Sequence, residues 1–190
     1  MTAGRGDALT PRRELIEVRI GTLRQMFNSM DPSPFRDRDL DPKVEEFIVE
    51  SSRELPASRP LSLVVYLSAE AARSEDTGLL QQAVQEYFSQ RALAERRSLR
   101  RLLRIGRTSL LIGLAVLAVA IVLGDVVSDL VGRYDYGEII AHSLLIGGWV
   151  ALWRPIEIFL YDWWPIRGEA QLYDRLSAMP VRVIAQAAAS

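Results

Sequence analysis

The sequence predicts an α+β cytoplasmic domain with an inserted transmembrane α-helical hairpin. Two observations support this fold class: charged and apolar residues are segregated along the 190-residue chain, and strand-like segments flank the long apolar runs on both sides. Residues 1–107 hold most of the charge, whereas residues 108–161 hold most of the long apolar runs. The predicted sheet contains three strands, at 14–20, 61–67 and 180–185.

The first half of the chain is predicted to form most of the domain. Residues 1–12 are small and polar, which is typical of a mobile tail, and residues 13–104 form the cytoplasmic α+β region. Glu14–Ile20 is rich in β-branched residues and predicts a strand. Asp41 followed by Pro42 predicts a helix start, with the cap residue first and proline at the first helical position.

The helix that starts at Pro42 has an apolar face at helical spacing, which we expect to be buried: Val44, Phe47, Ile48, Ser51 and Leu55. The near-continuous apolar run Leu61–Leu67 has the length of a strand. A long helix then begins near Leu79. Nothing breaks it before Gly106, so it is expected to continue through an arginine-rich segment into the first crossing.

The hairpin is predicted over residues 105–161, with its first crossing at about 107–127. Thr108–Gly124 contains 17 residues without a charge, and no polar stripe interrupts it. A bilayer core of about 30 Å needs about 20 mainly apolar helical residues, and a few flanking residues complete that length.

The second crossing is predicted at about 139–160. Ile139–Trp153 is uncharged but short, and Ile139–Leu160 would extend about 33 Å as a helix. The alternative is a short crossing that ends at Trp153 and turns into an interfacial helix. Pro155 marks a bend in either case, because it lacks the N–H that would donate to the carbonyl of Ala151.

Charge sets the expected orientation. Residues 91–107 carry seven arginines against Glu95, whereas the 125–138 loop carries four acidic residues against Arg133. Positively charged flanks stay in the cytoplasm, so both termini are expected there. Of the 23 basic residues only Lys43 is a lysine, a bias we attribute to a GC-rich bacterium. The predicted location is therefore the bacterial inner (plasma) membrane, with two crossings.

Residues 162–190 are expected to return to the cytoplasmic domain as a helix over 169–178 and a strand over 180–185. A two-stranded sheet is marginal in water, so this third strand would complete the sheet within one chain. The competing interpretation is that apolar strands pair between two chains of a dimer.

Several ionisable residues lie within or beside the second crossing. On a helix Arg154, Glu157 and Tyr161 share one face, because they are three and four residues apart. The predicted intramembrane polar patch is Arg154, Glu157, Tyr161, Asp162 and His142. Charged groups at membrane depth are functional candidates, for binding a partner helix, a lipid head group or a proton. The structural alternative is an ion pair that lets arginine reach the inner interface.

A second candidate site lies just before the first crossing. It consists of arginines that would hold anionic lipid head groups or act only as a topology signal: Arg96, Arg97, Arg100, Arg101, Arg104 and Arg107. The formal net charge of −1 argues against a nucleic-acid partner. The expected partners are the lipid bilayer, its anionic head groups, and either a second copy of the chain or another protein.

Residue types exclude many kinds of chemistry. The chain has no cysteine and a single histidine, His142, which excludes thiolate sites and a histidine metal cage within one chain. The acidic residues between Asp37 and Glu46 lack the spacing of a calcium loop. No phosphate-binding glycine loop or nucleophile elbow is present in the sequence. We therefore expect no catalytic residue, no metal and no cofactor, and a protein that is not an enzyme.

Two segments carry a resemblance: WRPIEIFLYDWWPI followed by LYDRLSAMPVRV, and SPFRDRDLDP. They resemble an uncharacterised family of small bacterial two-crossing inner-membrane proteins. The resemblance implies two crossings and no activity. The leading functional hypothesis is a membrane-anchored interaction or scaffolding module. The alternatives are an oligomeric subunit of a transport or ion-handling assembly, and a lipid-acting membrane enzyme with Glu157 and Asp162 as its carboxylates.

Overall fold

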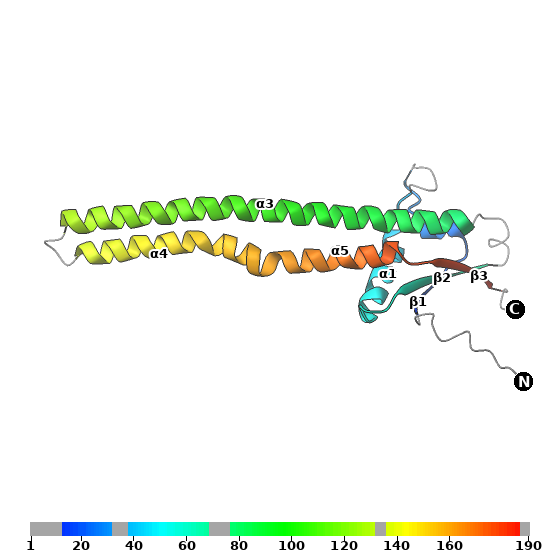
Figure 1. The fold of residues 1–190 in the computed structure, drawn as a ribbon. Helices are drawn as coiled ribbons and strands as arrows, with labels where there is room; N and C mark the ends of the chain where they lie inside the picture. The colour runs from blue at the N-terminus through cyan, green and yellow to red at the C-terminus, as the bar shows by residue number, and fades with distance from the viewer. Residues whose placement is uncertain (1–12, 32–37, 69–76, 132–135, 187–190) are drawn as a thin grey trace, which may run out of the picture. The chain divides into compact units, whose positions relative to one another are not determined.

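The computed structural model describes residues 13–31, 38–68, 77–131 and 136–186 (Figure 1). The predicted tail at 1–12 lies outside these residues. The chain divides into two compact units, one of residues 1–93 with 169–190 and one of residues 94–168. We call them the sheet unit and the helical unit.

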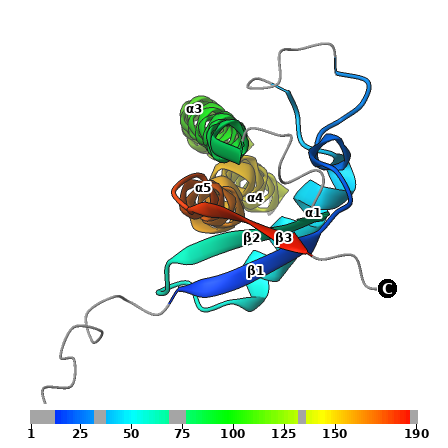
Figure 2. The same cartoon turned by 90° about the vertical axis from the view of Figure 1, so that its right-hand side faces the viewer.

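The sheet unit contains the predicted three strands: β1 (Glu14–Arg19), β2 (Leu61–Ser68) and β3 (Val181–Gln186). Figure 2 shows β2 between β1 and β3, and all three strands are parallel. In the register, Ile16 lies beside Leu63 and Leu63 beside Val181. The prediction of a third strand from the end of the chain is confirmed, and the strands pair within one chain.

The continuous apolar run of β2 is explained by its central position. Parallel strands are joined by crossovers that cover the sheet, so a central strand is buried on both sides. Leu63, Val65 and Leu67 are buried in the core on one face, and Val64 is buried on the other. The edge strand β1 instead alternates, with Ile16 and Val18 buried.

Two helical elements connect β1 to β2: the 3₁₀ turn η1 (Leu23–Met26) and helix α1 (Pro42–Glu54). The predicted helix start is confirmed, because the side chain of Asp41 accepts a hydrogen bond of 2.9 Å from the backbone N–H of Lys43. The predicted buried face is partly wrong. Ile48, Val49 and Ser52 are buried, whereas Phe47 is 50% exposed.

The long helix is continuous, as expected: α3 (Thr77–Val131) begins in the sheet unit and contains the whole first apolar run. The second apolar segment forms α4 (Tyr136–Glu157), a π-helical turn η3 (Ile158–Asp162) and α5 (Trp163–Ser177). The ribbon changes direction where α4 gives way to α5 (Figure 1). Pro155 lies inside α4 just before this change, which agrees with the predicted bend.

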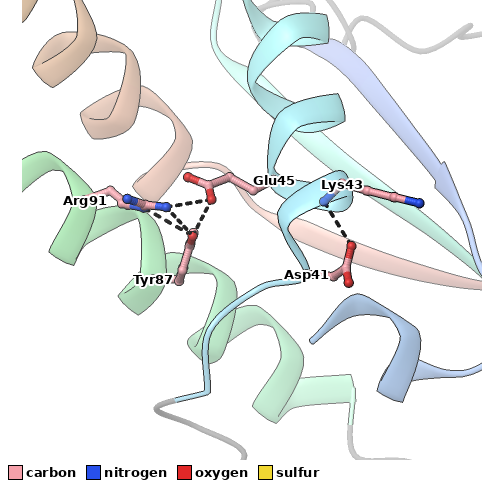
Figure 3. A network of polar contacts seen from close by, with 5 residues as sticks. All are labelled: Asp41, Lys43, Glu45, Tyr87 and Arg91. Atoms are coloured by element: carbon pink, nitrogen blue, oxygen red, sulfur yellow. Dashed lines mark hydrogen bonds and ion pairs between the residues drawn. The ribbon is translucent and has the colours of Figure 1, made fainter. Parts of the chain in front are cut away.

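A polar network joins α1 to α3 within the sheet unit (Figure 3). The hydroxyl of Tyr87 donates to Oε2 of Glu45 at 2.6 Å, and the guanidinium of Arg91 donates to the same oxygen at 2.7 Å. Arg91 also donates to the Tyr87 hydroxyl at 3.0 Å. Burial, together with the hydrogen bond to Glu45, raises the pKa of Tyr87 above its ordinary range. The network therefore favours the neutral phenol.

We predict that Tyr87→Phe lowers the free energy of unfolding by about 1 kcal/mol at neutral pH, because it removes a hydrogen bond to a partly buried carboxylate. Since the pKa of folded Tyr87 lies above that of the unfolded chain, this contribution is complete below about pH 10 and is lost as the pH rises further. Thermal unfolding of the full chain in detergent at several pH values measures both effects. A stability difference that grows above pH 10 would contradict the assignment.

Candidate functional site

The helical unit has the polarity of a membrane protein. Most of its buried residues are small or lie where the two helices cross, whereas its large apolar side chains face outward. Leu111 is 69% exposed and Val150 is 67% exposed. Within the described residues, two helical segments are long and apolar enough to cross a membrane, Gly78–Leu130 and Ile139–Ser177, and only 17% of the most apolar stretch of each is buried. The core helix of a soluble protein would be mostly buried.

Glycines set the contact between the two antiparallel helices. A Cβ on Gly106 would lie 2.8 Å from the Ile158 side chain, and one on Gly148 would lie 2.8 Å from the Leu117 side chain. Gly106, Gly113 and Ala120 are buried and follow one another at intervals of seven residues. This spacing keeps small residues on one seam, which lets the backbones approach without a strict GxxxG motif.

One close approach coincides with the helix bend. A Cβ on Gly113 would lie 2.9 Å from the carbonyl oxygen of Ala151 and 2.8 Å from Leu152. Pro155 has no N–H to donate to the Ala151 carbonyl in α-helical geometry. An unsatisfied carbonyl is costly in hydrocarbon, and Cα–H groups contribute weak hydrogen bonds at close helix contacts. Gly113 therefore covers the carbonyl that Pro155 leaves without its usual donor.

The predicted polar patch is only partly assembled. Arg154 forms two ion pairs of 3.1 Å, one with Glu157 and one with Asp162. The indole N–H of Trp153 also donates to Glu157 at 2.9 Å. Arg154, Glu157 and Asp162 therefore form a charged cluster with two acids and one base.

The π-helical turn explains why Asp162 reaches Arg154. On an uninterrupted α-helix, residues eight apart are separated by about 80° around the axis. A π turn accommodates one additional residue, which brings the eighth residue to within about 20° of the first. On an uninterrupted α-helix Asp162 would therefore lie on a different face from Arg154. The π turn η3 brings Asp162 back to the face of Arg154.

Tyr161 and His142 do not join the charged cluster. Tyr161 is 69% exposed, and the described contacts of the cluster do not include it. His142 is 12 residues before Arg154 on α4, or about 18 Å away along the axis. His142 lines a shallow hollow of about 160 Å³ that Asp125 also lines. Glu138 is four residues before His142 in the sequence, and its side chain lies outside the described residues.

The register of the helices gives the depth of these groups. Gly106 lies beside Ile158, and Gly113 lies beside Ala151. Arg154 is therefore level with Leu110, about two residues, or about 3 Å, inside the uncharged run that begins at Thr108. An arginine this close to the end of the run can extend its guanidinium to the interface, so the geometry favours the structural ion pair over a mid-membrane site.

The arginine cluster occupies one side of α3. At 100° per residue its six members lie within an arc of about 140°. All six are exposed in the structure: Arg96, Arg97, Arg100, Arg101, Arg104 and Arg107. Within the described chain, the side chains of Arg97, Arg101, Arg104 and Arg107 form no ion pair. Arg91, earlier on the same helix, is instead held by Glu45 and Tyr87.

We predict that Gly113→Ala destabilises the helical unit by about 1–3 kcal/mol, because the new Cβ would lie 2.9 Å from a backbone carbonyl oxygen, so the backbone must shift to admit it. Gly147→Ala is the matched control: no atom lies within 4 Å of its Cβ position, so the substitution is expected to be neutral or slightly stabilising. Unfolding in mixed micelles, followed by tryptophan fluorescence, compares the two. Equal effects at both positions would contradict the packing described for Gly113.

The described residues contain no group of three acidic or histidine side chains that could hold a metal ion. Comparisons with protein-family models, curated proteins and solved structures find no match for this chain. The resemblance carried by Trp153–Ile166 therefore stays a prediction.

Proposed function

We propose that this protein is a membrane-anchored interaction module without a catalytic role. It holds the small sheet unit at the cytoplasmic face of the bacterial inner membrane, where that unit docks a protein partner. Both termini lie in the cytoplasm, and the two apolar helices cross the bilayer as a hairpin.

The observation that supports this proposal is the inverted polarity of the helical unit. Lipid tails are as apolar as leucine, so exposed Leu111 and Val150 are stable in a bilayer and costly in water. In lipid the hydrophobic effect does not drive helices together, and close packing of small residues replaces it. Gly113 and Gly148 supply that packing.

The distribution of charge supports the orientation. The exposed arginines up to Arg107 flank one end of the uncharged run, and Asp125 and Asp129 flank the other. Basic residues close to a crossing stay on the cytoplasmic side, and each adds about 1 kcal/mol of attraction near an anionic surface. The ion pairs of Arg154 lie at the same end as the arginines.

The separation of the polar groups favours an anchor over a transport pathway. His142 and Arg154 lie near opposite ends of the uncharged segment Ile139–Trp153, about 18 Å apart along α4. Between them α4 carries Ser143 as its only other hydroxyl or charged side chain, so it offers no continuous polar stripe.

We predict that the protein stays in the membrane fraction after alkaline carbonate washing, and that its two polar ends face opposite sides. The chain has no cysteine, so single-cysteine variants report position directly. In spheroplasts, Ser128→Cys is expected to react with a membrane-impermeant maleimide, whereas Ser98→Cys, in the arginine segment, reacts only after lysis. Release by carbonate, or labelling of Ser98→Cys in intact spheroplasts, would refute the proposed topology.

A further inference from the structure

Strand β1 is an edge of the described sheet with one row of backbone groups facing away from β2. The N–H of Glu14 donates to the carbonyl of Pro60, and the N–H of Ile20 donates to that of Tyr66. In a parallel pair, alternate residues point to the same neighbour, so Ile16 and Val18 also bond to β2. The N–H and C=O groups of Leu15, Glu17 and Arg19 therefore point outward.

An apolar hollow lies beside this edge. Its volume is about 540 Å³, and it lies between the end of β1 and the first half of α1. Val18 and Ile20 line it from the strand, and Val44 and Phe47 line it from the helix. Phe47, which the sequence placed in the core, is half exposed because the described chain leaves this hollow unfilled.

The charges on the edge are self-complementary. Glu17 and Arg19 lie on the same face of the sheet, two residues apart, and both contact Tyr66: its hydroxyl donates to Glu17 at 3.3 Å, and the Arg19 guanidinium lies 5.5 Å from the centre of its ring. In an antiparallel pair of two β1 strands centred on Val18, Glu17 of each copy would lie opposite Arg19 of the other. Opposite charges in directly opposed positions stabilise a strand pair.

We propose that a second copy of this chain docks on β1, so that two sheets join into one continuous six-stranded sheet. The outward groups of Glu17 and Arg19 then form the hydrogen-bonded cross-strand pairs, and the two Val18 residues meet at the two-fold axis. Val18 and Ile20, which line the hollow in each copy, then lie beside the hollow under α1 of the other copy.

The charge pattern of β1 differs from that of an edge strand whose charges only prevent pairing between copies. Charged side chains of one sign on an edge strand oppose pairing between copies. Glu17 and Arg19 have opposite charges, and their spacing places each opposite the other residue of a second copy in antiparallel pairing. The other edge strand, β3, carries only one charged residue, Arg182. This inference does not require the membrane anchor, because the strand pair forms entirely between sheet units.

Charge reversal tests the proposal in the full chain in detergent micelles, with the association state measured by native mass spectrometry over a range of protein concentrations. Glu17→Arg and Arg19→Glu should each weaken dimerisation about 10- to 100-fold, because each places like charges opposite each other twice. The double variant Glu17→Arg/Arg19→Glu should restore it, and a mixture of the two single variants should form heterodimers. A wild-type chain that stays monomeric, or single variants that dimerise as tightly as wild type, would overturn the proposal.

Cysteine crosslinking tests the register independently. In the proposed pair the Cα atoms of the two Val18 residues lie about 4.5 Å apart, within the range of a disulfide. Val18→Cys should therefore crosslink under mild oxidation. Leu15→Cys is the matched control, because six residues of strand, or about 20 Å, separate Leu15 from its counterpart. Crosslinking of Leu15→Cys but not Val18→Cys would overturn the register. If neither variant crosslinks and the wild-type chain is monomeric, the proposal that a second copy docks on β1 is overturned, and a strand of another protein would be the candidate for this edge.

Discussion

The helical unit depends on the close approach of two helices whose large side chains face away from each other. In water that arrangement would expose the apolar surface and leave the contact between the helices to glycines and alanines. In lipid the preference reverses, because hydrocarbon solvates leucine and valine while small residues allow the backbones to meet. The contacts of Gly106, Gly113 and Gly148 are of the kind that membrane helices use to pack together.

The same close approach determines where the charged groups lie. Because Gly113 packs against Ala151, Arg154 falls near the level of Thr108, at the end of the uncharged run. Pro155 and the π turn that follows it rotate Asp162 toward Arg154, so the arginine has two carboxylates within 3.1 Å. This position near the end of the run agrees with the interpretation that the cluster is an ion pair through which arginine reaches the interface.

Local patterns in the sequence were sufficient for much of the fold. The apolar run of β2 predicted a strand because a central parallel strand is buried on both faces, and the Asp41–Pro42 pair predicted the start of α1 because capping depends on adjacent residues. The third strand followed from the instability of two strands alone. The two long helices followed from the absence of charge over their apolar runs.

What the sequence did not predict depends on distant contacts or on a change of helical period. No local pattern pairs Glu45 with Arg91, because the two residues are 46 positions apart in the chain. The sequence does not show which of the adjacent residues Gly147 and Gly148 packs against the other helix, and in the structure only Gly148 faces α3. Asp162 was predicted in the polar patch, but its ion pair with Arg154 depends on a π turn that no residue type specifies. The half-exposed Phe47 is explained by a hollow beside β1, which becomes visible only when α1 and the strand are placed together.

A membrane anchor requires that the apolar run of α3 be in contact with lipid tails. Spin labels on single cysteines along residues 107–125, in the full chain reconstituted into bilayers, measure this directly through collisions with oxygen and with a water-soluble nickel complex. We expect the highest oxygen and lowest nickel accessibility near Val116, with nickel accessibility rising toward Arg107 and Asp125. Uniformly high nickel accessibility along the run would show that water surrounds it, and would contradict the account.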